Sequence, residues 1–361
     1  MEQADRDCSS ILSSVQAKLR MMTALMTELQ ATIDANPTKF DVVFLGETML
    51  RFSPDNILRL EQAQSLQVHV GGSESNSAVG LARLGKRTAW ISRLTNNQLG
   101  RRIEQTIAAH GVDTNNVVWT NEDRVGMYFL ESGVPPRNSQ VIYDRANSAY
   151  SKLRFEDLPA DIFIPGKSKW LHVTGISLWL GETTRSLIAD SVSRAKSAGW
   201  QISFDVNYRA LLCDAAKAST FCKDLFETAD LVFLPKRDAI QLWQMNAKES
   251  DDAIMSQLIK IRNGKVTVMT LGARGAIACN ATQCVTQSID PVDPIGRLGG
   301  GDAFSAGFLS AWLEQPDLKR SLMWATAMAR LKYSIVGDLP LVSRSEVESL
   351  VNGLAEGSLL R

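Results

Sequence analysis

The sequence predicts an α/β fold of three layers, in which helices cover both faces of a mostly parallel central sheet. Two observations indicate this fold. Short apolar runs alternate with longer segments of helical periodicity, and no Ser/Gly-rich linker or internal repeat interrupts that alternation. A βαβα order favours parallel strands, because each helix returns the chain across one face of the sheet. The 361 residues suffice for one such domain with a small accessory sheet.

The elements follow from composition and periodicity. The predicted strands are short and apolar: Val42–Leu45, Thr88–Ser92, Trp170–Val173, Ile202–Val206, Leu231–Leu234 and Val266–Leu271. The predicted helices between them repeat apolar residues every three or four positions: Asn76–Leu84, Gln98–His110, Thr183–Ala198, Ala215–Thr228 and Asp252–Arg262. Three further helices end the chain, at about Ala303–Leu313, Leu318–Ile335 and Arg344–Leu354.

Two segments, about 50–70 and 117–143, interrupt this order. Both are rich in β-prone residues, and apolar and polar residues alternate in Gly126–Glu131 and Gln140–Tyr143. They predict a small β lid that covers one edge of the main sheet. Because an exposed apolar sheet edge is usually covered, we expect a homodimer that packs through the lid.

Residues 1–38 form an extension before the domain, which spans residues 39–361. Apolar residues in this extension recur at helical spacing and predict one amphipathic helix. Such a helix could pack on the domain or on a second subunit, and a targeting role is the alternative. The acidic start of the chain, with no apolar stretch behind it, does not resemble a signal peptide.

The composition narrows the classes of function. Lys+Arg and Asp+Glu number 39 each, so the chain lacks the basic excess that is typical of nucleic-acid binding. No apolar run reaches the roughly 18 residues of a membrane span. The five cysteines form no CxxC pair and the three histidines are far apart, which argues against a zinc site. The odd, scattered cysteines favour a reducing cytoplasm over a disulfide framework.

The segment that indicates chemistry is Gly299-Gly300-Gly301-Asp302, which opens an apolar helix. Glycines let backbone N–H groups approach a ligand closely, and a helix N-terminus favours an anion. A phosphoryl group in transfer is such an anion, and the Asp302 carboxylate could accept the proton of an attacking hydroxyl. The alternative is that Asp302 serves only as an N-cap of the helix.

This segment resembles the C-terminal signature of the ribokinase/PfkB carbohydrate kinase family, and the resemblance covers about residue 40 to the C-terminus. The turn Gly71–Ala78 is similar to the N-terminal signature of the family, with Gly100 at the expected later glycine. Val268–Ala276 resembles its nucleotide-binding strand and turn. The resemblance therefore implies a ribokinase-like fold and an ATP-dependent kinase that uses Mg²⁺. A monovalent cation is a further candidate cofactor, and no metal ligands are assigned.

The resemblance also implies roles for individual residues. Asp302 would be the catalytic base, and the amides of Gly299, Gly300 and Gly301 would form the anion hole. Substrate hydroxyls would lie at Gly71, Gly72 and Asn76, although Asn76 could instead be a helix N-cap. The nucleotide would lie against Thr270, Gly272, Ala273, Gly275 and Thr326.

Within the family, three segments are most similar to 2-keto-3-deoxygluconate kinases: Gly46–Pro54, Val141–Ala149 and Phe204–Arg209. That similarity implies sugar-acid contacts by Tyr128, Tyr143, Arg145, Arg209 and Asp338. Two guanidinium groups suit a carboxylate, because each offers a planar pair of donors. A structural ion pair is the alternative for each arginine. The leading hypothesis is phosphorylation of 2-keto-3-deoxygluconate at its 6-hydroxyl; a fructokinase or related hexose kinase and a scaffold without turnover are the alternatives.

Three segments differ from the family pattern. The loop Asp293–Gly296 is longer than the usual step before the glycine turn. Leu234–Asp238 stands where the family often has an Asn-x-x-Glu element linked through water to magnesium, so Lys236 or Arg237 could face phosphate groups or be solvated surface charges. Thr326 replaces an amide side chain. A Walker-like segment, Gly80–Arg87, lacks the Ser or Thr after its lysine and ends a predicted helix, which favours Gly85 as a C-terminal cap.

Overall fold

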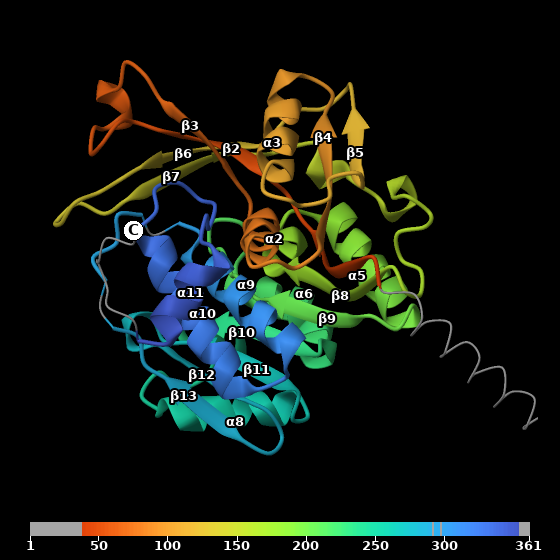
Figure 1. Ribbon diagram of the computed structural model, residues 1–361. Helices are drawn as coiled ribbons and strands as arrows, with labels where there is room; N and C mark the ends of the chain where they lie inside the picture. Colours follow the sequence, from red (N-terminus) through yellow and green to blue (C-terminus); the bar gives the residue numbers. More distant parts are fainter. Residues whose placement is uncertain (1–37, 291, 297, 354–361) are drawn as a thin grey trace, which may run out of the picture.

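The structure is a computed structural model that describes residues 38–290, 292–296 and 298–353. The predicted N-terminal helix lies outside these ranges, as does the last residue of the predicted C-terminal helix. Across the described residues the three-layer α/β prediction is confirmed (Figure 1). No described helix is both long and apolar enough to cross a membrane.

A nine-stranded sheet runs through the centre of the domain, in the order β13-β12-β11-β10-β9-β8-β1-β4-β5. All neighbouring strands from β11 to β5 are parallel, and β12 and β13 add an antiparallel edge. Each of the six predicted strands is present. The strands are β1 (Phe40–Leu45), β4 (Thr88–Thr95), β5 (Val117–Thr120), β8 (Ser168–Thr174), β9 (Gln201–Asp205), β10 (Leu231–Pro235), β11 (Val266–Thr270), β12 (Ala276–Cys279) and β13 (Cys284–Gln287).

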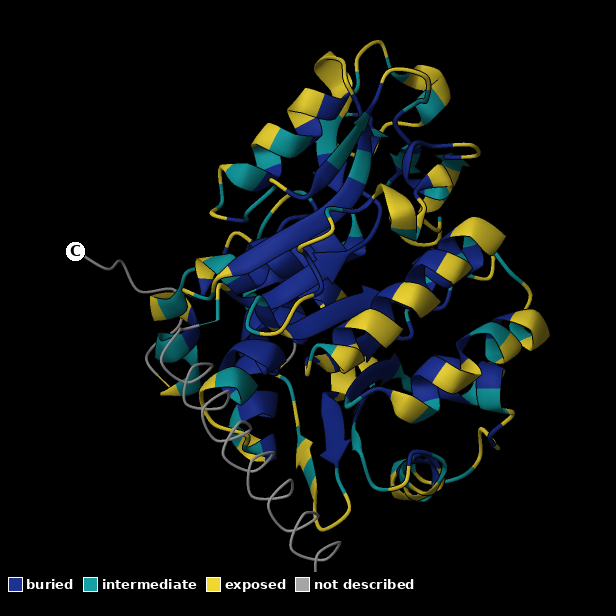
Figure 2. Cartoon of the chain, turned by 90° about the vertical axis from the view of Figure 1, so that its right-hand side faces the viewer, coloured by how far each residue is buried: buried dark blue, intermediate teal, exposed yellow. Residues whose placement is uncertain are grey.

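The helices divide between the two faces of this sheet, and each face has its own apolar cluster. In β1, Val43 and Leu45 pack into one cluster, whereas Val42 and Phe44 pack into the other. Figure 2 shows the consequence: the strands are buried, and the flanking helices are exposed on their outer sides. One face carries α4 (Gly175–Trp179), α5 (Glu182–Ser197), α6 (Ala215–Thr228), α7 (Lys236–Trp243) and α8 (Asp251–Ile261). The other carries α2 (Ser73–Arg83), α3 (Gln98–Ala108), α9 (Gly300–Glu314), α10 (Leu318–Tyr333) and α11 (Arg344–Val351).

A second, four-stranded sheet extends from the domain at the upper left of Figure 1. Its order is β3-β2-β6-β7, with β2 and β6 parallel and the outer pairs antiparallel. The predicted lid boundaries were too wide, because Val117–Thr120 pairs with β4 and belongs to the main sheet. The strands of this small sheet are β2 (Met49–Ser53), β3 (Gln67–Gly71), β6 (Met127–Glu131) and β7 (Gln140–Asp144).

The expectation that the cysteines are scattered and unpaired was wrong for two of them. Cys279 and Cys284 form a disulfide within the β12–β13 hairpin. The antiparallel register places the two residues directly opposite each other, although they are five positions apart in sequence. Cys213 and Cys222 are free, and Cys8 lies outside the described residues.

Candidate active site

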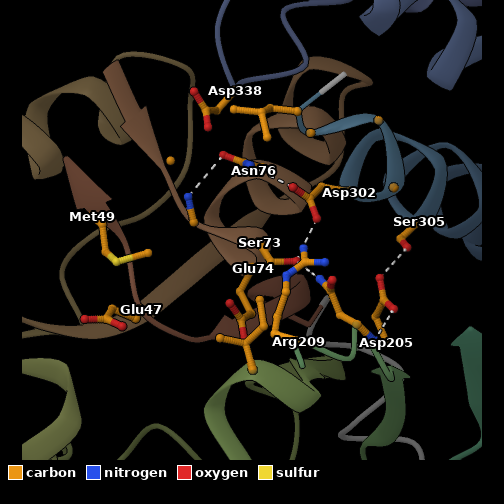
Figure 3. A pocket seen from close by; sticks show the side chains of 18 of the residues that line it. Glu47, Met49, Ser73, Glu74, Asn76, Asp205, Arg209, Asp302, Ser305 and Asp338 are labelled. Carbon is orange, nitrogen blue, oxygen red and sulfur yellow. Dashed lines mark hydrogen bonds between the residues drawn. The ribbon is translucent and has the colours of Figure 1, made fainter. Parts of the chain in front are cut away.

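The candidate site lies where the parallel strands of the main sheet end, at the position where open α/β sheets usually bind ligands. A cavity of about 530 Å³, here called the larger cavity, opens there. Its walls come from segments far apart in sequence, including the residues after β1 and β9, the last residues of β10, the start of α9 and the small sheet. Figure 3 shows the side chains that point into it.

The glycine turn begins helix α9 at the floor of this cavity. Gly299 is the N-cap, with φ of 74°, a left-handed conformation that glycine adopts without strain. Asp302 is the third residue of the helix, so the alternative that it is the N-cap is wrong. A Cβ on Gly301 would meet no atom within 4 Å. The first turn of α9 is therefore open to a ligand at Gly301 while Asp302 lies beside it in the cavity wall.

The Asp302 carboxylate is held by the start of helix α2 (Figure 3). Ser73 Oγ donates to Oδ1 and Asn76 Nδ2 donates to Oδ2, each at 2.7 Å. Asn207, after β9, donates to the Ser73 hydroxyl at 2.7 Å. Gly72 is the N-cap of α2, so Asn76 is not a cap residue. Its amide orients the carboxylate, a contact that the sequence reasoning did not foresee.

Electrostatics set the protonation of Asp302. Burial raises its pKa, while the bonds from Ser73 and Asn76 and the nearby Arg209 guanidinium oppose that rise. Arg209 lines the larger cavity and forms no ion pair among the described residues. Its guanidinium is therefore available to an incoming anion, and the structural ion-pair alternative does not apply to it.

The opposite wall of the cavity contains a buried pair. Arg51 Nε and the Tyr128 hydroxyl both donate to the Asp338 carboxylate, at 2.7 and 2.5 Å. Burial and the adjacent Asp338 charge raise the pKa of Tyr128 well above its ordinary value. Two predicted substrate residues, Tyr128 and Asp338, thus contact each other and link the small sheet to the segment after α10.

Arg145 differs from Arg209. It forms a buried ion pair with Glu47, the residue after Gly46. The ring of Tyr143 lies 5.6 Å from the guanidinium carbon. The other carboxylate oxygen of Glu47, Oε1, is buried without a hydrogen-bond partner. The structural ion-pair alternative therefore describes Arg145, although both members of the pair line the cavity.

Two more carboxyl groups line the larger cavity. Burial, with the nearby Asp302 and Asp238 charges, raises the pKa of Asp205 to about 8. Burial also raises the pKa of Glu74 to about 7, although Thr174 donates hydrogen bonds to it. Burial thus favours the neutral form of both groups, and a cation bound beside them would favour the ionised form.

A second cavity of about 360 Å³, the smaller cavity, adjoins the first at the glycine turn. Thr270, Gly300, Gly301 and Phe304 line both cavities. The remaining walls of the smaller cavity are made mainly of small and apolar residues: Gly272, Ala273, Gly275, Ile289, Val292, Pro294, Thr326 and Ala329, with Asp290 and Tyr333.

The three segments that differ from the family pattern are all described. The loop before the glycine turn is tied to the end of α10, because Ile295 N donates to Tyr333 O at 2.9 Å. Lys236 pairs with Asp251 at 2.8 Å and its side chain is 20% exposed, whereas Arg237 is 62% exposed and pairs with the buried Asp238 at 2.9 Å. Neither residue lines either cavity. The Thr326 hydroxyl donates to carbonyls of its own helix while its side chain borders the smaller cavity.

Every site residue named from the sequence lines one of the two cavities. The sequence reasoning missed several others that the structure adds to the larger cavity: Glu47, Ser73, Glu74, Asp205 and Asn207. Each lies inside or beside a motif that was already recognised. The signal was present, but no motif indicated which polar neighbours face inward.

The two cavities meet at a glycine turn that has a carboxylate beside it. This arrangement suits a phosphotransferase, which brings a nucleotide and an alcohol together. The comparisons agree. The model of the pfkB family of carbohydrate kinases matches residues 39–339, and the chain belongs to this family. It is therefore a carbohydrate kinase with an alcohol group as acceptor.

Several similar proteins are kinases of 2-dehydro-3-deoxy sugar acids, which are also called 2-keto-3-deoxy sugar acids. The chain is 34% identical to the 2-dehydro-3-deoxygalactonokinase of Haloferax volcanii, over 87% of this chain and 97% of that protein. It is 30% identical to the 2-dehydro-3-deoxygluconokinase of Bacillus subtilis, over 87% and 96%. The crystal structure of the 2-dehydro-3-deoxygluconokinase from Thermotoga maritima superposes with a TM-score of 0.82, at 29% identity over 87% and 100% of the chains.

Proposed function

We propose that this protein transfers the γ-phosphoryl group of ATP to the primary hydroxyl of a 2-keto-3-deoxy sugar acid, with 2-keto-3-deoxygluconate converted to its 6-phosphate as the leading candidate. The observation that supports this most directly is the position of Asp302. Its carboxylate lies beside the open amides of the glycine turn, at the junction of the two cavities. The relatives named above act on substrates of this class.

In this proposal the sugar acid occupies the larger cavity and ATP the smaller one. Asp302 accepts the proton of the attacking hydroxyl as the new O–P bond forms and the bond to ADP breaks. Ser73 and Asn76 hold the carboxylate in place for that step. The amides at the start of α9 face the transferring group, where the helix dipole favours negative charge.

Magnesium would arrive with the nucleotide. The described residues contain no cluster of three or more metal-ligating side chains, which suits an ion that binds mainly phosphate oxygens and water. Asp205 is the protein group that fits such an ion best. It lines the larger cavity, is buried and has no cationic partner in hydrogen-bond contact among the described residues. The ion would neutralise charge on the phosphates during transfer.

The charged side chains of the larger cavity indicate which class of substrate it could bind. Arg209 is available for a carboxylate, whereas Arg145 is already paired with Glu47. A single available guanidinium is enough for one carboxylate. The engaged Arg145 also keeps a second candidate open, a fructokinase or related hexose kinase, because the Glu47–Arg145 pair could bind neutral hydroxyls.

A substrate panel tests the proposal. Purified protein with ATP and Mg²⁺ would be assayed for ADP formation with 2-keto-3-deoxygluconate, its C4 epimer 2-keto-3-deoxygalactonate, fructose and ribose. We expect the two sugar acids to give the highest kcat/KM, and phosphate at C6 by NMR. A kcat/KM that is higher for fructose than for either sugar acid would instead identify the protein as a hexose kinase. ADP formation that no sugar raises above background would favour the scaffold alternative.

We also propose that the protein forms a homodimer through the small sheet. On the face away from the cavity, a row of apolar side chains crosses all four strands. Phe52 is paired with Val68 and Phe129, and Phe129 is paired with Ile142. The Ile142 side chain is 54% exposed. Light scattering should show a dimer that Ile142→Glu weakens, whereas Ile57→Glu, at an exposed position of the loop after β2, should not. A monomeric parent protein would contradict the proposal.

A further inference from the structure

Lys332, in the last turn of α10, is one of the largest fully buried side chains among the described residues. A buried ammonium group is costly unless it is paired or well solvated by the protein. Lys332 forms no ion pair with a carboxylate in the described part of the chain. Instead, its Nζ donates to two backbone carbonyls, those of Ile335 at 3.0 Å and Gly337 at 2.9 Å.

The position of this ammonium explains the arrangement. It lies at the C-terminal end of α10, where the helix dipole favours a positive charge. The charges of Asp338 and Asp302 attract it, the Arg51 charge repels it, and burial lowers its pKa. Lys332 is therefore placed between the negative end of one helix and the glycine turn that begins another.

The lysine stem also contacts the glycine turn directly. A Cβ built on Gly299 would lie 3.2 Å from Lys332 Cε and 2.0 Å from the carbonyl oxygen of Asp338. The segment from Ile335 to Asp338 is thus held between the lysine and the turn. Any shift of Lys332 would shift both the N-cap of α9 and the residue that binds Arg51 and Tyr128.

From these contacts we propose that Lys332 is a positioning residue whose ammonium serves as a built-in monovalent cation behind the anion-binding turn. The family resemblance of the sequence made a monovalent metal ion a candidate cofactor. Carbonyl oxygens are the ligands such an ion would take, and here a lysine occupies two of them. The residues therefore do not fit a separate ion at this point, and activity should not require one. This inference rests on the kinase activity proposed above.

The test compares salts of equal ionic strength. The parent enzyme should show the same kcat, within about twofold, in potassium, ammonium and tetramethylammonium chloride. Lys332→Ala should lose about 10–100-fold in kcat in tetramethylammonium chloride with little change in either KM, because a positioning contact is lost. Potassium or ammonium ions should restore much of that loss by entering the vacated space. Lys332→Met, which fills the space without a charge, should not be restored.

Two outcomes would overturn the inference: strong activation of the parent enzyme by potassium, or a Lys332→Ala variant whose kcat is unchanged in tetramethylammonium chloride. If the variants do not fold, the salt series on the parent enzyme decides. Thermal unfolding supplies a readout independent of turnover. Ammonium chloride should raise the Tm of Lys332→Ala relative to tetramethylammonium chloride and leave the parent Tm unchanged. A protein that phosphorylates no sugar fails the kinase proposal, while this Tm comparison still tests the lysine.

Discussion

The two cavities that meet at the glycine turn are built in opposite ways. Several of the charged groups that line the larger one are buried and paired: Arg145 pairs with Glu47, and Asp338 pairs with Arg51 behind the wall. The smaller one is lined largely by glycine, alanine and other small or apolar residues. Side chains in fixed pairs can discriminate between hydroxyl and carboxylate groups, whereas backbone and small residues offer shape. Under the proposed function, this difference means that specificity for the acceptor resides in the larger cavity, whereas the smaller one accommodates ATP.

The largest effect should come from the junction of the cavities. Asp302→Asn keeps the shape of the side chain but removes the base, and it replaces one of the two acceptor oxygens by an N–H donor. We expect kcat to fall by roughly 10²–10⁴-fold, the usual contribution of a general base. Steady-state kinetics with saturating ATP would measure this, with circular dichroism as the control for folding. A kcat close to that of the parent enzyme would refute the role of Asp302.

The next largest effect should come from the charged cavity. Arg209→Ala removes the available guanidinium, and a charge-assisted contact of about 1.5–3 kcal/mol corresponds to a loss of roughly 10–150-fold in kcat/KM for a sugar acid. The pKa of Asp302 should also rise, because the Arg209 charge lowers it. The acid limb of the pH–kcat profile should therefore move to higher pH.

Arg194→Ala is the matched control for this experiment, since Arg194 is exposed on α5 and lines neither cavity. It should leave both kcat/KM and the pH profile unchanged. Equal losses in the two variants would indicate a general effect of charge rather than a substrate contact at Arg209.

Gly301→Ala tests the junction from the other side. The new methyl group meets no protein atom within 4 Å, so it would project into open space where the phosphoryl group is proposed to lie. We expect kcat to fall at least about tenfold, while stability is unchanged or rises by up to about 1 kcal/mol, because alanine favours a helix over glycine. Kinetics and thermal unfolding of the same sample would show the two opposite effects. Unchanged activity would mean that this amide does not face the phosphoryl group.

A separate effect is expected on stability rather than on turnover, namely a change in its pH dependence. The pKa of Asp205 is about 8 in the folded protein and near 3.8 when unfolded. Between these values the folded state holds a proton that the unfolded state has lost, so stability is greatest at low pH and declines as pH rises through the folded pKa. The limit for one such group is on the order of 1 kcal/mol per pH unit. Asp205→Asn should flatten the decline in the free energy of unfolding between pH 5 and 8, measured in urea. An equal slope in both proteins would contradict the assignment.

The recognised motifs predicted where the site lies more accurately than they predicted which side chains contact each other in it. Asp302 and the glycines were identifiable because a helix start and a left-handed residue leave a local signal. The partner of Arg145 was not identifiable, because Glu47 lies 98 positions earlier and the contact exists only after β1 and β7 are brought together. The Cys279–Cys284 bond was missed for a similar reason, since it depends on the register of a hairpin that was not predicted.

The sequence by itself determined the order of six main-sheet strands and most helices, the glycine turn and the class of chemistry, because apolar periodicity and glycine conformation act over a few neighbouring residues. Tertiary structure alone decided which charges are paired and which are available. Arg51 pairs with Asp338, 287 positions away in sequence. The Lys332 ammonium donates to the carbonyls of Ile335 and Gly337, beside the glycine turn. The cost of burying a charge depends on its surroundings in three dimensions, and no local pattern along the chain records those surroundings.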